Sequence, residues 1–422
     1  MPQRWRRLCL LVSSYFFYSL YSFQGVAVLF AVSAADYVFG RLIAAADRRR
    51  GAVLAAAILL NVATLCYYKY SGTLLLIGIS FYIFQALSYL IDVYLEKIEA
   101  ETNFGCLLLY LAFFPKLLQG PIERAESLLP QLHGPSHFDW EGSGEGVKLL
   151  LTGFFKKVVI ADRLSVLVAA VFDKPAAYHG LSVLIAVYAY TLQIYFDLSG
   201  YTDIARGIGK LFGIELSENF DRPYFATNIQ DFWRRWHISF SSWLRDYLFL
   251  PLMSALRDWG TAGVAATALI TFVICGFWHG ATWGFIVFGS LHGAYMAVSI
   301  LTLKTRDAWI KRRALNVKWV RAARTFVTFN MVAASFVFFR TVSLSAAFAI
   351  FSRLWGGLNA GVIAAALSPL EMAILLVSFA CLLHRPLIEP LRRRPALFYA
   401  IIANAVIFLG IKSDAPFIYF QF

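Results

Sequence analysis

Two histidines lie in strongly apolar surroundings, where an ionisable side chain needs an explanation. His279 stands in the stretch Cys275–Gly284, among tryptophans and glycines, and His237 follows a run of aromatic and arginine residues. At bilayer depth an ionisable group is costly and usually marks a site, although a histidine can also simply hydrogen-bond a neighbouring helix. Desolvation favours a neutral imidazole, which can accept a proton. We expect His279 to do so, with the structural role as the alternative.

Glycines recur at every fourth position around His279, at Gly276, Gly280 and Gly284. This spacing predicts a stripe of small residues at which another helix or a substrate comes close. His292 follows thirteen residues after His279, which is about 140° around a continuous helix. His292 is therefore no direct partner of His279 unless that helix is broken.

The segment around His237 predicts one helix from Asn228 to Tyr247. Asn228 is a favourable N-cap with Asp231 three residues on, and Pro251 limits the far end. His237 falls on the broad aromatic face of this helix, and the opposite face is polar: Arg235, Ser239, Ser242 and Asp246. Aromatic residues mixed with arginines are typical of an interfacial membrane helix, so a plain anchor explains every residue here except His237.

Asp197 is the third buried polar candidate, in the stretch Gln193–Asp203. We place it near the end of a span over residues 180–196. A carboxylate there caps the next helix or pairs with Arg206, and we favour this role slightly over a chemical one.

The composition places these residues in a membrane. Of 422 residues, 59% are hydrophobic and 15% are charged, with a mean hydropathy of +0.65, whereas soluble domains carry about 25% charged residues. The basic residues behind the net charge of +13 lie in short loops between apolar runs. This distribution indicates membrane topology and not nucleic-acid binding. The five cysteines are scattered singly without metal-ligand spacing, as small core residues are.

Apolar runs predict about 11–12 membrane segments, including broken ones. Basic ends at Arg4–Arg7 and Arg48–Arg50 favour a hairpin of two spans with a cytoplasmic N-terminus, and a signal peptide is rejected for want of a cleavage site. The basic passage Lys311–Arg324 is also expected to be cytoplasmic. Further spans are predicted at about 52–70, 73–95, 147–170, 180–196, 325–341, 344–364, 369–384 and 396–411.

Two stretches interrupt this pattern. Residues 104–121 contain Pro115, Gly120 and Pro121, so we expect a broken or re-entrant segment at an internal chamber. Residues 127–146 are rich in turn formers and are predicted to be a loop. His133 and His137 in that loop have metal-compatible spacing but no third ligand nearby, so no metal site is assigned.

Six segments in order resemble a known family. They are Gly78–Tyr82, Phe113–Pro115 with Gly120–Ile122, Tyr195–Tyr201, Phe232–Ser239, Gly276–Trp283 and Phe417–Phe422. From about residue 75 to the end, the chain resembles membrane-bound O-acyltransferases of the bacterial alginate O-acetylation type, which are related to the D-alanyl transfer protein of teichoic acid synthesis. The resemblance implies an all-α polytopic membrane protein with broken helices around a central cavity, forming one domain over 1–422 with its motif core at about 75–300.

The resemblance also implies roles for individual residues. His279 matches the catalytic histidine and His237 the second polar residue of the site. Asp197, Trp278, Trp236 and Arg235 are kept as supporting residues. His279 would take the proton of an acceptor hydroxyl during attack on a thioester, while His237 orients the acceptor or stabilises the oxyanion.

The implied reaction transfers an acyl group, most of all acetyl, from a cytoplasmic thioester toward hydroxyls of an extracytoplasmic polysaccharide. The donor would be acetyl-CoA or an acyl carrier protein, used as a substrate, with no bound cofactor and no metal. Expected partners are membrane lipid and extracytoplasmic polysaccharide-modification proteins, and the expected location is the bacterial inner membrane. The alternatives are D-alanyl transfer to a cell-wall polymer, a proton-coupled acyl or lipid transporter, and a non-catalytic scaffold.

Two departures from the family pattern leave the acceptor open. The N-terminal region is one leading helix shorter than is usual, and Leu252–Arg257 replaces a glycine-rich turn that contains Asn and Arg.

Overall fold

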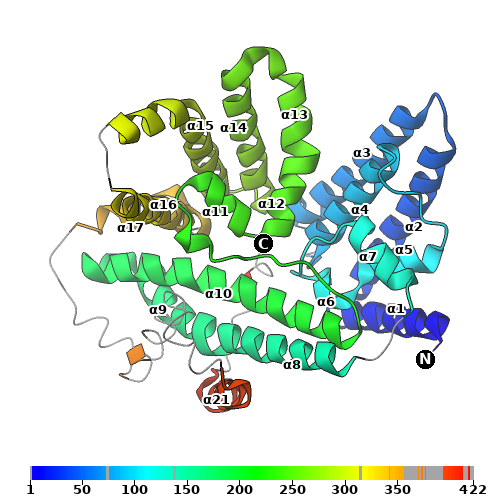
Figure 1. The fold of residues 1–422 in the computed structure, drawn as a ribbon, viewed down its shortest axis with the longest axis horizontal. Helices are drawn as coiled ribbons and strands as arrows, with labels where there is room; N and C mark the ends of the chain where they lie inside the picture. Colours follow the sequence, from blue (N-terminus) through cyan, green and yellow to red (C-terminus); the bar gives the residue numbers. More distant parts are fainter. Residues whose placement is uncertain are drawn as a thin grey trace. The chain divides into compact units, whose positions relative to one another are not determined.

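The computed structural model describes residues 2–72, 76–135, 139–312, 316–341, 343–355 and 393–411, with the single positions 369, 372, 373, 376, 417 and 418. Within these residues the chain is built from helices and contains no strand (Figure 1). One isolated antiparallel bridge joins Phe220 to Trp236. The all-α prediction is confirmed.

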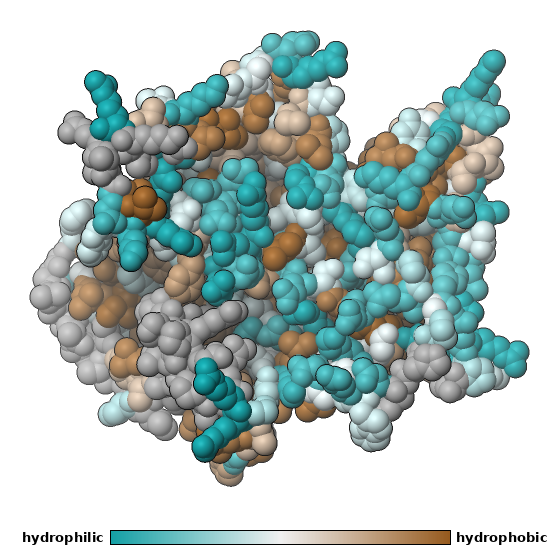
Figure 2. Space-filling model, viewed as in Figure 1, coloured by the Kyte–Doolittle hydropathy of each residue, from teal (hydrophilic) through white to brown (hydrophobic). Residues whose placement is uncertain are grey.

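Six helices in the described part are long and apolar enough to cross a membrane. They are α2 (Phe23–Ala45), α3 (Arg50–Tyr70), α10 (Leu181–Leu211), α14 (Gly260–His279), α15 (Trp283–Arg312) and α16 (Val317–Arg340). Hydrophobic side chains gather on the surface around α3 and around α14 and α15 (Figure 2), and Leu59 on α3 is 70% exposed. Exposed apolar surface on this scale fits contact with lipid, and the protein is polytopic.

The N-terminal apolar stretch folds as two helices, as predicted. α1 (Gln3–Ser19) and α2 are separated by a short turn, and the Ser22 hydroxyl caps α2 by accepting a hydrogen bond from the Gly25 N–H at 2.9 Å. α3 matches the prediction at 52–70. α4 (Ile79–Tyr94) begins later than the predicted position 73, after Gly78 at φ 83°; residues 73–75 lie outside the described residues.

The chain divides into two compact units. Unit 1 holds residues 1–150 and 201–219, and unit 2 holds residues 151–200 and 220–422. Unit 2 contains both histidines of interest.

Unit 1 contains the predicted helix break. α5 (Phe104–Ala112) stops at Phe113, and a single helical turn, α6 (Phe114–Leu117), follows it. Lys116 on α6 is fully buried, donates a hydrogen bond to Gln85 and lies 5.2 Å from the Tyr110 ring centroid. The prolines and glycine of this segment therefore interrupt a buried helix, as expected.

The prediction of a loop at residues 127–146 is wrong. Most of it is helical, in α7 (Ala125–His133) and the start of α8 (Trp140–Phe154). One glycine of this stretch packs two helices together instead of forming a turn: a Cβ on Gly146 would lie 2.9 Å from the Gly207 carbonyl oxygen. The sequence pattern could not distinguish a glycine that ends a helix from one that lets another helix approach.

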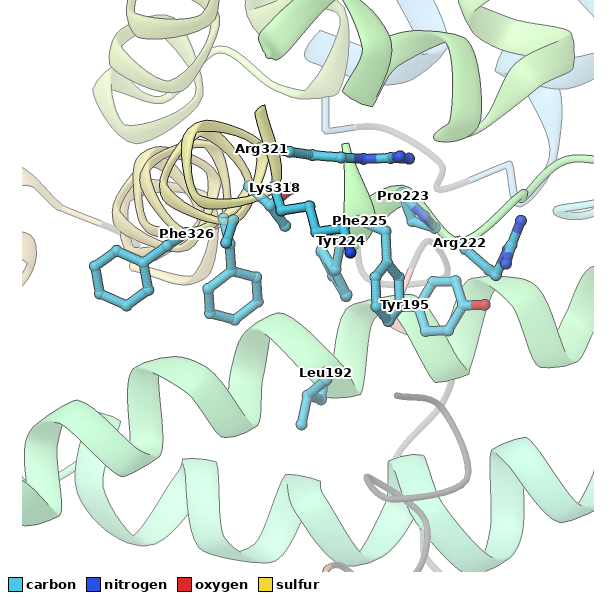
Figure 3. A pocket seen from close by; sticks show the side chains of 12 residues that line it. Leu192, Tyr195, Arg222, Pro223, Tyr224, Phe225, Lys318, Arg321 and Phe326 are labelled. Carbon is cyan, nitrogen blue, oxygen red and sulfur yellow. The ribbon is translucent and has the colours of Figure 1, made fainter. Parts of the chain in front are cut away.

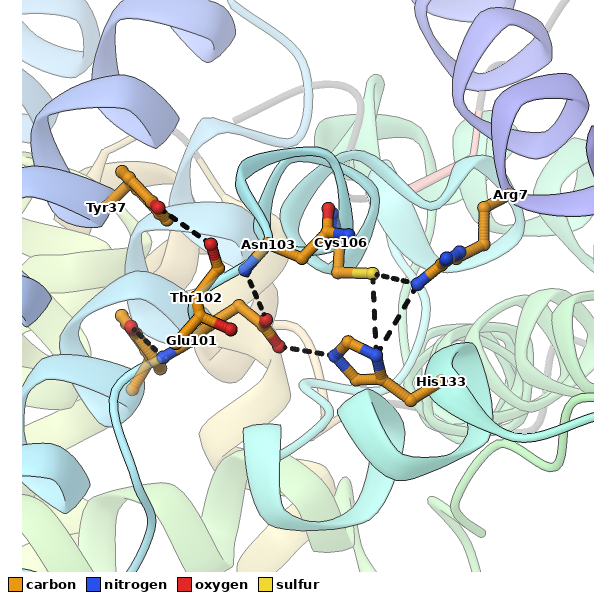
Figure 4. Close-up of polar contacts among 8 residues, drawn as sticks. Arg7, Tyr37, Glu101, Thr102, Asn103, Cys106 and His133 are labelled. Atoms are coloured by element: carbon orange, nitrogen blue, oxygen red, sulfur yellow. Dashed lines mark hydrogen bonds and ion pairs between the residues drawn. The ribbon is translucent and has the colours of Figure 1, made fainter. Parts of the chain in front are cut away.

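His133, at the end of α7, belongs to a polar cluster that joins three parts of unit 1 (Figure 4). Its Nε2 donates to Glu101 Oε2 at 2.7 Å, and Arg7 Nη1 donates to Cys106 Sγ at 3.1 Å. No group of side chains in the described residues is placed to hold a metal ion, and His137 lies outside those residues. The cluster ties α1 and α7 to the start of α5.

The remaining described helices lie mainly in unit 2. α8 continues through a π-helical segment (Phe155–Ala161) into α9 (Asp162–Phe172). The others are α11 (Ile229–Arg235), α12 (Ile238–Leu244), α13 (Leu250–Ala255), α17 (Leu344–Ser352) and α21 (Pro395–Leu409). α21 matches the last predicted span, whereas most of the span predicted at 369–384 lies outside the described residues.

Candidate active site

His237 lies at a break between two short helices and not inside the single helix predicted from Asn228 to Tyr247. The Asn228 cap is confirmed, since its Oδ1 accepts from the Asp231 N–H at 2.8 Å. α11 ends at Arg235, Trp236 is extended, and His237 adopts a left-handed φ of 44° before α12 begins. Histidine is among the few residues that enter this region at modest cost, and such strain is common at functional sites.

Backbone pairing with residues 220–221, before α11, stabilises this break in the helix. The Asp221 N–H donates to the Arg235 carbonyl at 2.9 Å, and Phe220 bridges Trp236. The predicted helical wheel is therefore wrong beyond Arg235. Phe232, Trp233, Phe240 and Trp243 are buried, so these aromatic side chains pack inside the protein. Pro251 does not end the segment either, since it lies in the first turn of α13.

His279 is the last residue of α14, at the tip of a helical hairpin. Gly280 is extended, and α15 starts at Trp283. The hairpin is tight because a Cβ on Gly276 would lie 2.3 Å from the Phe285 carbonyl oxygen and 3.1 Å from the Gly289 Cα. The predicted close contact at a small residue is confirmed at Gly276. The three glycines do not form one stripe, because Gly276 lies on α14, Gly280 lies between the helices and Gly284 lies on α15.

The two imidazoles line one small cavity in unit 2. Its volume is about 10 Å³, which is the room that about one water molecule needs. His237 is 3% exposed and His279 4%. The other lining residues are Ile194, Trp233, Trp236, Phe240, Phe288, Phe336 and Phe339. The cavity is thus a narrow aromatic chamber with two imidazoles in its wall.

Aromatic rings hold both imidazoles in place. The Phe240 ring centroid lies 5.2 Å from that of His237 and 6.1 Å from that of His279. Phe339 packs edge-on against His279 at 4.9 Å. Burial lowers the pKa of His237 to about 3, so this imidazole is neutral at physiological pH and acts as a hydrogen-bonding group without charge.

A third histidine, His292 on α15, supports the chamber wall. Trp233 Nε1 donates to His292 Nδ1 at 3.2 Å, which leaves the proton of a neutral ring on Nε2, 2.8 Å from Ser335 Oγ. Trp233 itself lines the cavity. The sequence analysis excluded His292 as a direct partner of His279 on the assumption of one continuous helix. The helix instead ends at His279, and the hairpin brings His292 against Trp233 in the cavity wall.

The supporting residues have different positions. Trp236 lines the cavity, and Trp278 stacks on Phe240 at 4.5 Å, one residue from His279. Arg235 does not reach the cavity; its Nε donates to Asp231 Oδ1 at 2.8 Å, and its backbone holds the break described above. The structure therefore brings Trp236 and Trp278 to the imidazoles and places Arg235 outside.

Asp197 lies inside α10, not near a span end, and it pairs with Lys157 and not with Arg206. Lys157 Nζ is 2.8 Å from both Asp197 Oδ2 and Asp162 Oδ1, and Asp197 Oδ1 accepts from the Ile418 N–H at 3.1 Å. The π-helical turn explains the pair of Lys157 with Asp162, because residues five apart face each other in that geometry. Arg206 pairs instead with Glu218 at 3.1 Å. Asp197 does not line the histidine cavity.

Comparison with known proteins identifies the family of this chain. The model of the membrane-bound O-acyltransferase family matches residues 101–342, which include both histidines. A probable alginate O-acetylase of Pseudomonas putida is 32% identical over 100% of this chain and 95% of its own length. A peptidoglycan O-acetyltransferase of Helicobacter pylori is 30% identical over 83% of this chain and 74% of its own length.

A more distant relative extends the range of acyl groups. A teichoic acid D-alanyltransferase of Streptococcus thermophilus is 29% identical over 62% of this chain and 68% of its own length. The family match covers more than half of the chain, and the first relative spans all of it. The chain is an O-acyltransferase and belongs to the membrane-bound O-acyltransferase family.

Proposed function

We propose that this enzyme transfers an acetyl group from a cytoplasmic thioester to hydroxyls of an extracytoplasmic polysaccharide, directly or through a partner protein of the same process. The observation that carries the proposal is the shared cavity of His237 and His279, which come from two separate chain breaks. The acetyl group is favoured because both relatives at 30% identity or more reported above are named for O-acetyl transfer.

The proposed reaction is a direct transfer. The His279 imidazole accepts the proton of an acceptor hydroxyl as that oxygen attacks the thioester carbonyl. The oxyanion that forms receives a hydrogen bond from His237, which stays neutral and carries one N–H. Collapse breaks the C–S bond, and the leaving thiolate takes the proton from His279. The product is an oxygen ester and a free thiol, and the enzyme is unchanged.

The narrow aromatic chamber favours these steps, because it leaves little room for water. Hydrogen bonds and charges act more strongly where water is excluded, and a thioester is protected there from hydrolysis. The walls are aromatic rings and one isoleucine, with no charged side chain among the lining residues. The free space is the size of one water molecule, so the chamber must widen to admit the thioester carbonyl and the acceptor hydroxyl, and the rest of each substrate must occupy neighbouring space.

A larger pocket beside the chamber supports an approach route for the donor. This pocket of about 430 Å³ lies between α11, α12, α14 and α15, and Trp233 lines both it and the histidine cavity. Its polar lining includes Arg234, Arg245 and Ser241. Arginines suit the phosphates of a carrier, while the apolar remainder suits its thioester arm.

The direction and the acyl group are tested together in membrane vesicles of the host. Inside-out and right-side-out vesicles receive an acetyl thioester labelled in the acetyl group, and ester-linked label on the polysaccharide is measured. Label should enter the polymer only when the thioester reaches the cytoplasmic face. Transfer from the opposite face would overturn the proposed direction, and an ester group with the mass of alanyl would favour D-alanyl transfer instead.

A further inference from the structure

A second pocket of unit 2 lies along the membrane helix α16, outside the catalytic chamber (Figure 3). We call it the α16 groove. It has a volume of about 570 Å³ and lies between α16, α10 and the turn Arg222–Phe225 that precedes α11. Figure 3 shows the rings of Tyr195 and Tyr224 between α16 and α10. The groove is large enough for part of a lipid.

Three cations stand at the groove: Arg222, Lys318 and Arg321. All three are exposed. Arg222 has only a distant carboxylate partner, Asp221 at 3.4 Å, and no carboxylate of the described residues pairs with Lys318 or Arg321. Because nearby carboxylates offset so little of this positive charge, the three cations attract an anionic group.

The lining changes from cationic to apolar along α16. Lys318 and Arg321 lie in its first two turns, and Phe326 and Phe329 follow further along. The eleven residue steps from Lys318 to Phe329 span about 16 Å of helix. Leu192 of α10 completes the apolar part. A phospholipid has the same order over the same depth, a charged head followed by hydrocarbon.

The groove is also open to lipid. α16 is a candidate membrane span, and its Phe326 and Val327 are 67% and 54% exposed. The exposed surface of this helix is thus suited to the hydrocarbon of a bilayer, and the cationic end belongs to the basic passage that the charge pattern places at the cytoplasmic face.

An acyl donor would fit the groove less well, although it too carries phosphates. Tyr195 and Tyr224 form the wall of the groove, and Trp236 lies behind them, with its ring centroid 6.4 Å and 6.1 Å from theirs. Trp236 lines the histidine cavity on its other side. A thioester held in the groove is separated from both imidazoles by this layer of rings.

We propose that the α16 groove binds one anionic membrane phospholipid. Its phosphate sits on Arg222, Lys318 and Arg321, and an acyl chain lies along Phe326, Phe329 and Leu192. Basic pockets between membrane helices bind anionic head groups in this way. This site is additional to the proposed acyl transfer and does not depend on it.

The test counts lipids that stay on the purified protein. Protein reconstituted in phosphatidylcholine nanodiscs with a minority of phosphatidylglycerol is released into detergent, and native mass spectrometry measures retained phosphatidylglycerol. The wild type should retain one such lipid selectively. Lys318→Gln with Arg321→Gln should weaken retention about 30-fold, since each basic residue near an anionic lipid contributes about fivefold. Arg312→Gln, a nearby cation outside the groove, should change nothing.

A second pair of variants fills the groove without changing charge. Thr325 lines the apolar part, and Val327 faces outward two residues later. Thr325→Trp should abolish selective retention, whereas Val327→Trp should leave it intact. Equal retention in all variants would overturn the site. Displacement of the retained lipid by coenzyme A would also overturn it and make the groove a donor site.

Discussion

Unit 2 buries two groups of polar side chains, and they are surrounded very differently. At Lys157 every charge faces an opposite one, with two carboxylates at 2.8 Å and a backbone N–H on Asp197. At the histidine cavity, the two imidazoles face aromatic rings around a space the size of one water. The first arrangement satisfies buried charges and leaves nothing over for a substrate. The second places two imidazoles beside free space, an arrangement that suits the proposed proton transfer.

We therefore expect the Lys157 group to contribute to stability and the histidines to the proposed acyl transfer. This difference makes opposite predictions for substitutions that are equally deep in the same unit.

The largest expected effect is on activity, from His279→Ala. Loss of a general base should lower acyl transfer about 10²- to 10⁴-fold, because the proton of the acceptor hydroxyl then has no positioned acceptor. The ester content of the polymer is measured beside the amount of protein in the membrane, which should stay near wild type. Wild-type ester content in a well-expressed variant would leave the scaffold or transport functions.

Lys157→Met should instead lower stability. Removing the cation leaves Asp162 and Asp197 buried and uncompensated, which costs about 3–5 kcal/mol. Thermal unfolding in detergent measures the loss. The triple variant with Asp162→Asn and Asp197→Asn should recover most of it, and activity per folded molecule should stay close to wild type. A stable but inactive Lys157→Met protein would move this group into the active site.

His237→Gly sharpens the distinction, because glycine accepts the left-handed backbone at this position without strain. The fold should persist while transfer falls about 10²- to 10³-fold, as when one oxyanion donor is removed. His237→Asn also tolerates the backbone and keeps a side-chain donor. It should retain more activity than His237→Gly. Equal loss in both would assign His237 a role other than hydrogen-bond donation.

The smallest effect is expected at the helix crossing that positions His279. Gly276→Ala puts a Cβ 2.3 Å from the Phe285 carbonyl oxygen, so the backbone must move. This movement should lower the free energy of unfolding by about 1–3 kcal/mol. Both thermal stability and activity should fall moderately. Gly144→Ala on α8 is the matched control: its Cβ meets nothing within 4 Å, so it should stabilise by about 0.5–1 kcal/mol. Similar losses in both would mean that the crossing is not close.

The sequence predicted α3 and the apolar part of α16, whereas the basic residues just before position 325 also belong to α16, which begins at Val317. It also predicted the cap at Asn228. The prediction failed where the same local sequence pattern is compatible with two different structures. The segment after Asn228 has good helical periodicity, but a bridge to Phe220 breaks it, and no local signal at His237 reveals that distant partner.

Long-range contacts explain the other misses. Asp197 pairs with Lys157, forty positions earlier in the chain, and sequence periodicity does not reveal a contact between two separate helical segments. His292 was set aside because one helix was assumed through Gly280. The signal that could have found it was the glycine spacing itself, since Gly276 and Gly289 allow a hairpin as well as a stripe.

The hairpin of α14 and α15 also dictates when the active site can form during synthesis. Only Gly280, Ala281 and Thr282 join the two helices, which leaves no length for a translocated loop, so they must enter the bilayer together. The chamber then still lacks Phe336 and Phe339 of α16. A nascent chain that stops before residue 336 would be inserted and anchored with both histidines in place, and would still be inert until its last aromatic wall emerges from the ribosome.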